Sequence, residues 1–254
     1  MDQTPPQESA PQAAPIATPP AHPRAKLSDL FIPAAILLAG IVLACSVYVV
    51  RLQHHIAHGT KNTQAVHPVT PSDHIVGNPS APVTIIEYAD TDSSYAKSFQ
   101  LTMEQLMTEY ASGGKVAWVY RHFPVTAEHV NAITNALAAE CAASLSTPPV
   151  FFRFIDAMQA DSPGTSQFNP RNYGHIIDTL GIPSAPFNDC VAKGTFTKHI
   201  REDYDNALAA GATGSPYIVL LVAGQPPAPI QGALPYLAIK KLVDQSIQKA
   251  ATAK

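Results

Sequence analysis

The chain has 254 residues, a formal net charge of −3 at pH 7, and a hydrophobic content of 46%. This length allows one sizeable domain with appendages, and the apolar content is typical of a globular protein. Because the charge is nearly balanced and no basic stripe stands out, a nucleic-acid partner is not expected.

Residues 1–27 are predicted to form a disordered, proline-rich tail. The first 24 residues contain seven of the 24 prolines in the chain and few large apolar side chains. Such a segment cannot bury enough surface to offset the entropy of ordering. A proline-rich ligand for a partner domain is the alternative interpretation.

Residues 28–51 are predicted to form one transmembrane helix. The 21 residues between Asp29 and Arg51 carry no charge, and about 20 apolar residues cross a hydrocarbon core of about 30 Å. A cleaved signal peptide does not fit the long proline-rich segment ahead of this span. VLAC, which ends at Cys45, resembles a lipoprotein cleavage box, but SVYVV after it stays apolar, which favours an intact helix.

Residues 52–72 follow as a polar juxtamembrane linker that is rich in histidine. His54 and His58 are spaced i,i+4 and could share a helix face that binds a metal ion. No cysteine or carboxylate nearby completes such a site, so neither a metal nor a cofactor is expected.

From about residue 73 to 250 the pattern indicates one α/β domain. Strands are predicted at 81–88, 115–123, 214–224 and 228–233, the first of them buried on both faces. A helix that contains Phe99 and Met103 is predicted to end at Gly113-Gly114. Further helices are predicted at 126–145, 149–158, 170–180, 184–191, 196–210 and 234–250.

The order of these elements is a β-α-β unit, a helical insertion at about 125–210, and a β-β-α unit. Both outer units must share one sheet so that their apolar strands are covered. We expect the first and last helices to flank that sheet and the insertion to form a lid. Within the insertion, Val130, Ile133, Leu137 and Cys141 are predicted to lie on one apolar stripe of a helix.

Five strings in this order resemble the DsbA-like family of thioredoxin-fold disulfide oxidoreductases. They are VGNPSAPVTIIEYAD, VAWVYRHFPV, AAECA, FNDCV and GATGSPYIVL. The resemblance covers about residues 73–249 and implies a thioredoxin-like α/β fold with a helical insertion.

At the redox motif, family members have Cys-Pro-x-Cys, and this chain has Ser93-Ser94-Tyr95-Ala96. The family's chemistry needs a thiolate that attacks a disulfide and a second cysteine that resolves the intermediate. A serine hydroxyl and an alanine can do neither, so we expect no dithiol oxidation at these positions. Glu87 matches the acid that the family keeps beneath its active site, and Lys97 is a candidate partner for it.

The residues at this junction also have interpretations without redox chemistry. Asp92 and Ser93 are both good N-cap residues for the helix that follows. A hydrolytic interpretation would make Ser93 a nucleophile with His122 as its base, and it is the less favoured of the two.

The resemblance also implies a structural disulfide between Cys141 and Cys190. By the chain-entropy estimate, closing a loop of about 50 residues is worth roughly 4 kcal/mol. Two buried free thiols are the alternative.

The resemblance further implies a cis peptide bond before Pro216, which would turn Ser215 toward the helix that starts near Ser93. Tyr95, Ser215, Pro216 and Tyr217 would then form a peptide-binding groove.

Two functions remain open on these grounds. In the first, the protein is an anchored binding module for exported or unfolded polypeptides, or for an envelope protein. In the second, it is a thiol–disulfide oxidoreductase that uses Cys141 and Cys190. In either case we expect the N-terminus in the cytoplasm and the domain outside it.

Overall fold

The computed structural model describes residues 65–147, 149–162 and 167–252. The chain divides into two units, residues 1–53 and 54–254, and all described residues lie in the second. The predicted tail, the predicted span at 28–51 with Cys45, and the His54–His58 pair therefore lie outside the described residues. No helix within the three described ranges is long and apolar enough to cross a bilayer.

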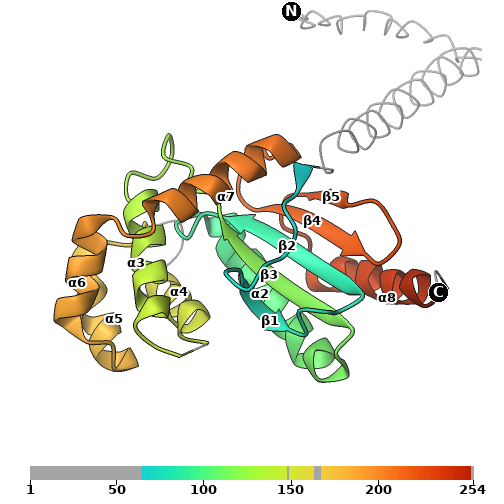
Figure 1. The fold of residues 1–254 in the computed structure, drawn as a ribbon, viewed down its shortest axis with the longest axis horizontal. Helices are drawn as coiled ribbons and strands as arrows, with labels where there is room; N and C mark the ends of the chain where they lie inside the picture. The colour runs from blue at the N-terminus through green and yellow to red at the C-terminus, as the bar shows by residue number, and fades with distance from the viewer. Residues whose placement is uncertain (1–64, 148, 163–166, 253–254) are drawn as a thin grey trace, which may run out of the picture. The chain divides into compact units, whose positions relative to one another are not determined.

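A five-stranded mixed sheet forms the centre of the described domain, in the order β1-β3-β2-β4-β5 (Figure 1). The pair β2–β3 is parallel, and the other three neighbouring pairs are antiparallel. The strands are β1 (His74–Gly77), β2 (Val83–Ala89), β3 (Val116–His122), β4 (Tyr217–Val222) and β5 (Ala228–Gln231).

Every residue of β2 and β3 is buried, which confirms the prediction that the first long strand is covered on both faces. Helices α2 (Ser94–Tyr110) and α8 (Tyr236–Thr252) pack on one face of the sheet. They flank the sheet as expected, but on the same side. Helix α7 (Thr197–Ala210) covers the opposite face.

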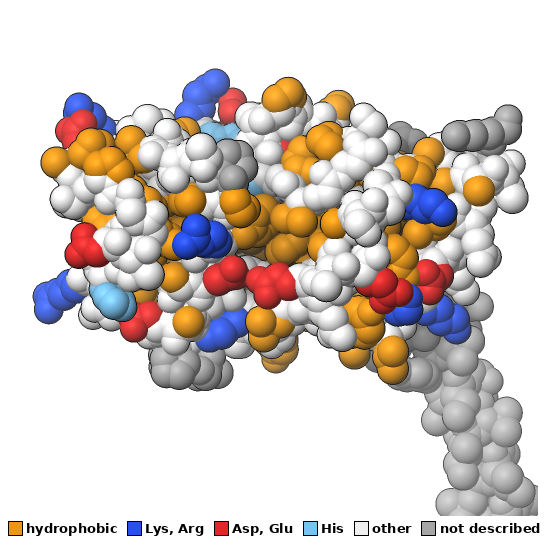
Figure 2. Space-filling view, turned by 90° about the horizontal axis from the view of Figure 1, so that it is seen from below, with side chains coloured by type: hydrophobic (Ala, Val, Ile, Leu, Met, Phe, Trp, Pro, Cys, Tyr) orange, Lys and Arg blue, Asp and Glu red, His pale blue; other side chains and the backbone are white. Residues whose placement is uncertain are grey.

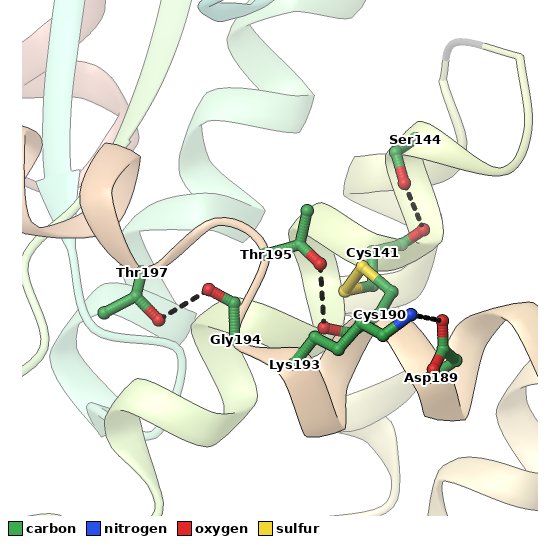
Figure 3. The surroundings of a disulfide bond; sticks show 8 residues. All are labelled: Cys141, Ser144, Asp189, Cys190, Lys193, Gly194, Thr195 and Thr197. Atoms are coloured by element: carbon green, nitrogen blue, oxygen red, sulfur yellow. Dashed lines mark hydrogen bonds and ion pairs between the residues drawn. A yellow bond between two sulfur atoms is a disulfide. The ribbon is translucent and has the colours of Figure 1, made fainter.

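The helical insertion packs around one hydrophobic cluster, which includes Phe151, Phe154 and Phe187 together with side chains of β2, β3 and α2. Cys141 and Cys190 form a disulfide that joins helix α3 to helix α6, as the resemblance implies (Figure 3). The helices before α7 are α3 (Ala132–Ser144), α4 (Val150–Ala160), α5 (Tyr173–Leu180) and α6 (Ser184–Lys193).

The predicted start of α3 at residue 126 is wrong, because the helix begins at Ala132. The segment ahead of it turns, and both Glu128 N–H and His129 N–H donate to the carbonyl of Val125. The predicted stripe is therefore only half buried. Leu137 and Cys141 are inside, whereas Val130 is 84% exposed and Ile133 is 43% exposed.

Residues 65–68, within the predicted linker, contact the folded domain. Arg121, which is buried, donates from its guanidinium to the carbonyls of His67 and Pro68 at 3.1 and 3.0 Å. It also donates to both carboxylate oxygens of Asp73, at 2.7 and 3.1 Å. Asn206 Nδ2 of α7 also donates to the carbonyl of Ala65 at 2.6 Å.

Replacing Arg121 with Met should destabilise the domain by about 3–5 kcal/mol, since it leaves the Asp73 carboxylate buried without its cation. Equilibrium denaturation of the full chain in detergent measures the loss. The matched control is Arg201→Met, because the Arg201–Asp205 pair is exposed and should contribute less than about 1 kcal/mol. Equal effects of the two changes would contradict the role assigned to the Arg121 contacts.

Candidate functional site

The candidate site lies where β2 ends and α2 begins. Ser93 is the N-cap of α2, and its Oγ accepts from the Ala96 N–H at 3.3 Å. The same hydroxyl donates to the carbonyl of Ser215 at 3.2 Å. The Ser215–Pro216 bond is cis, as the resemblance implies. The structure thus brings together the two segments that the sequence placed in one groove.

A pocket of about 240 Å³ opens at this junction. Tyr95 stands on its rim with 71% of its surface exposed. Three of the predicted site residues, Ala96, Pro216 and Tyr217, are buried and do not line it. The Tyr217 hydroxyl instead donates to the carbonyl of Ala210 at 2.6 Å. The lining residues are Ser93, Ser94, Tyr95, Val125, Glu128, His129, Gly214 and Ser215.

Asp90, at the end of β2, holds the walls of this pocket together. Its Oδ2 accepts from the Val125 N–H at 2.7 Å and from His129 Nδ1 at 2.9 Å. Its backbone N–H donates to Ser215 Oγ at 2.7 Å. The sequence pattern singles out neither Asp90 nor His129, because the partners lie about 35 and 125 residues away. An acid directly after a buried strand is the one local signal.

Asp92 does not cap the helix, although it is a suitable residue type. Asn135 Nδ2 of α3 donates to both of its carboxylate oxygens at 3.0 Å, and the Phe168 N–H donates at 3.1 Å. Burial raises the pKa of Asp92, against the effect of these hydrogen bonds. This side chain therefore joins the site to the insertion.

Glu87 lies beneath the site with no exposed surface. Its Oε2 accepts from Trp118 Nε1 at 2.9 Å, and its Oε1 has no hydrogen-bond partner among the described residues. Burial raises its pKa to about 8, although the bond from Trp118 acts in the opposite direction. The suggested pairing with Lys97 is wrong, because Lys97 Nζ donates to the carbonyls of Gln159 and Ser162.

No hydrogen bond joins His122 to Ser93, whose hydroxyl contacts the Ala96 N–H and the Ser215 carbonyl, while His122 Nδ1 has no partner among the described residues. His122 Nε2 lies 2.8 Å from Glu140 Oε1, and His74 Nε2 lies at the same distance from that oxygen. Burial opposes ionisation of Glu140, but the hydrogen bonds from His122 and His74 outweigh it and hold the pKa well below its usual range. In the described part of the chain, no group of His, Cys and acidic residues has the arrangement of a metal site.

The sequence profile of a family described as thioredoxin matches residues 69–221. The chain belongs to the thioredoxin family. Solved structures place its fold among DsbA-like members. α-DsbA1 of Wolbachia pipientis is 19% identical with a TM-score of 0.60, and covers 76% of this chain and 98% of its own. BdbD of Bacillus subtilis is 20% identical with a TM-score of 0.62, and the superposition covers 72% of this chain and 97% of BdbD.

Curated relatives of this thioredoxin-family chain are named as transporters. The Na⁺/H⁺ antiporter NhaA 3 of Salinispora tropica is 30% identical over 150 residues, which are 59% of this chain and 22% of the antiporter. NhaA 1 of Salinispora arenicola is 28% identical over the same length. The chain spans about a fifth of the length of these relatives.

The pocket of this thioredoxin-family domain is lined by hydroxyls, backbone groups, the Glu128 carboxyl, an imidazole and an exposed phenol ring, and by no sulfur. Its Ser93 hydroxyl already caps α2 and contacts Ser215. Among the described residues the cysteines are Cys141 and Cys190, which form the disulfide of the insertion. Such a set of groups is suited to non-covalent binding.

Glu87→Gln should stabilise the protein, and by more at pH 8 than at pH 5. Because the pKa of Glu87 is about 8 in the folded chain and near 4.5 when unfolded, the folded state binds more protons between these values, and its stability falls as pH rises through them. The difference between these two pKa values corresponds to at most roughly 5 kcal/mol in the free energy of unfolding. Denaturation at several pH values measures it, and an equal effect at pH 5 and pH 8 would contradict the raised pKa.

Proposed function

We propose that this chain is a membrane-anchored, redox-inactive DsbA-like protein that binds an extended polypeptide at the pocket between Ser93 and Ser215. The observation that carries the proposal is the contact of Ser93 Oγ with the Ser215 carbonyl at 3.2 Å. This contact holds the start of α2 beside the loop that precedes β4, and the groove between them contains no thiol. The membrane anchor is the predicted helix at 28–51.

The backbone beside this groove is suited to pairing with an extended chain. Residues 214–216 lie outside the sheet, directly ahead of β4, and a polypeptide can add to such a segment through main-chain hydrogen bonds. Tyr95 supplies an exposed aromatic ring on the rim, a residue type that is enriched at binding surfaces.

The alternative function, thiol–disulfide exchange through Cys141 and Cys190, is opposed by burial. Cys141 has no exposed surface, and Cys190, which is partly buried, packs against the same hydrophobic cluster. Exchange requires that an attacking thiolate reach one of the two sulfurs. We therefore assign this disulfide a structural role.

Two kinds of partner are compatible with the groove: exported or unfolded polypeptides, and a fixed envelope protein. The curated relatives named as Na⁺/H⁺ antiporters favour the second kind, because in them a similar segment belongs to the chain of a membrane transporter. We propose an integral membrane protein as the partner, with the domain outside the cytoplasm.

The native chain should show no turnover of a reduced dithiol peptide above buffer. Ser93→Cys combined with Ala96→Cys should create activity, because a helix N-terminus lowers the pKa of a thiol placed there. Oxidation of the peptide is followed with the full chain in detergent. Turnover by the native chain that disappears in Cys141→Ser/Cys190→Ser would support the relocated redox couple and overturn this proposal.

A photo-crosslinking amino acid in place of Tyr95 should capture the partner in intact cells. The matched control is the same amino acid at Leu208, which is 47% exposed on α7 and does not line the pocket. Mass spectrometry of the adducts identifies what is bound. The same adducts from both positions, or none from Tyr95, would count against binding at this groove.

A further inference from the structure

A second groove lies between α2, β1 and the start of α4, and it shares no residue with the Ser93 pocket. Its volume is about 380 Å³. Figure 2 shows one face of the molecule on which acidic side chains border an exposed hydrophobic area. The groove is lined by Val76, Met107, Trp118, Pro149 and Phe152, together with Thr108, Glu104 and Asp156.

Two acidic side chains from different helices meet at this groove. Gln100 Nε2 donates to Glu104 Oε1 at 3.4 Å and also to Asp156 Oδ1. Because one amide nitrogen reaches both groups, the two carboxyls lie close together. Burial, and then the neighbouring Glu104, raise the pKa of Asp156 to about 7.

No cation of the described residues forms an ion pair with either acid. Lys97, on the same helix as Glu104, donates to the carbonyls of Gln159 and Ser162. Arg153, three residues before Asp156 on α4, is exposed. The groove thus combines an apolar wall with a pair of carboxyls that lacks a counter-ion in the described chain.

We propose that this groove binds the side chain of an arginine from a partner polypeptide. The aliphatic stem would lie along the wall formed by Met107 and Phe152, as long basic side chains do on apolar surfaces. The planar guanidinium can donate to two carboxylates at once and can stack on an aromatic ring, which an ammonium does less well. The Phe152 ring packs against Trp118 with a centroid distance of 4.8 Å, so its position is fixed.

This inference goes beyond the function proposed for the Ser93 pocket, and it does not depend on it. The two sites lie along the same helix, and ten residues of α2 separate Ser94 from Glu104, which is about 15 Å. An extended polypeptide covers that distance with about five residues.

The test uses the full chain in detergent and three capped pentapeptides, Gly-Gly-X-Gly-Gly, in which X is arginine, lysine or citrulline. Isothermal titration should show the arginine peptide binding at least about tenfold more tightly than the citrulline peptide, which has nearly the same shape without the charge. The lysine peptide should fall between them. No binding of the arginine peptide, or equal binding of arginine and citrulline, would overturn the proposal.

Variants locate the binding. The double variant Glu104→Gln/Asp156→Asn should bind the arginine peptide about tenfold or more weakly than the native chain. Because this variant removes the repulsion between two neighbouring acids, it should leave folding intact. The control is Asp178→Asn, an exposed acid of α5, which should change nothing. Tyr95→Ala should also leave this affinity unchanged, so failure at one site is distinguishable from failure at the other. If Asp178→Asn weakened peptide binding equally, binding would depend only on the net charge of the protein, and the proposed arginine site would be wrong.

Discussion

The pocket of this protein depends on one buried carboxylate. Asp90 is 1% exposed, and a carboxylate in such a place is costly unless hydrogen-bond donors surround it. Its donors come from the backbone of Val125 and Asp92 and from the His129 ring, while its own N–H reaches Ser215. Because these bonds all meet at one residue, they hold the surrounding segments of the pocket together, and the Asp90 carbonyl also accepts from the Ser93 N–H at 3.1 Å.

The same kind of contact joins the insertion to the sheet. The apolar cluster of the insertion also includes Ala89, Ala96 and Tyr120 from the sheet and α2, and buried polar side chains add further contacts between the two parts. Asn135 binds Asp92, and Glu140 accepts from His74 and His122. The pocket lies at this joint, since Val125 and His129 belong to the chain that enters the insertion. A ligand there would contact both parts.

The sequence was sufficient to predict what depends on local pattern. The apolar runs of β2, β3 and β4 and the helices that end at Gly181 and Gly211 were predicted, and both glycines have the positive φ of a helix stop. The sequence was insufficient where the local structure depends on contacts between residues that are far apart along the chain. The four residues of β1 are too few to show a period. The late start of α3 and the burial of Ser93, Asp92 and Arg121 follow from contacts made across the fold, so the family resemblance located the groove but not its walls.

At Ser93 and Ala96, contacts that involve no sulfur stabilise the start of α2. A serine oxygen at the N-cap accepts the Ala96 N–H, so the helix start needs no thiolate to satisfy it. Ala96 is 2% exposed and packs in the core of the insertion, where a cysteine would behave as another small apolar residue. Neither position therefore needs sulfur for stability. Because a fold does not by itself fix a function, the packing of these two residues stabilises the start of α2 whatever chemistry takes place beside it.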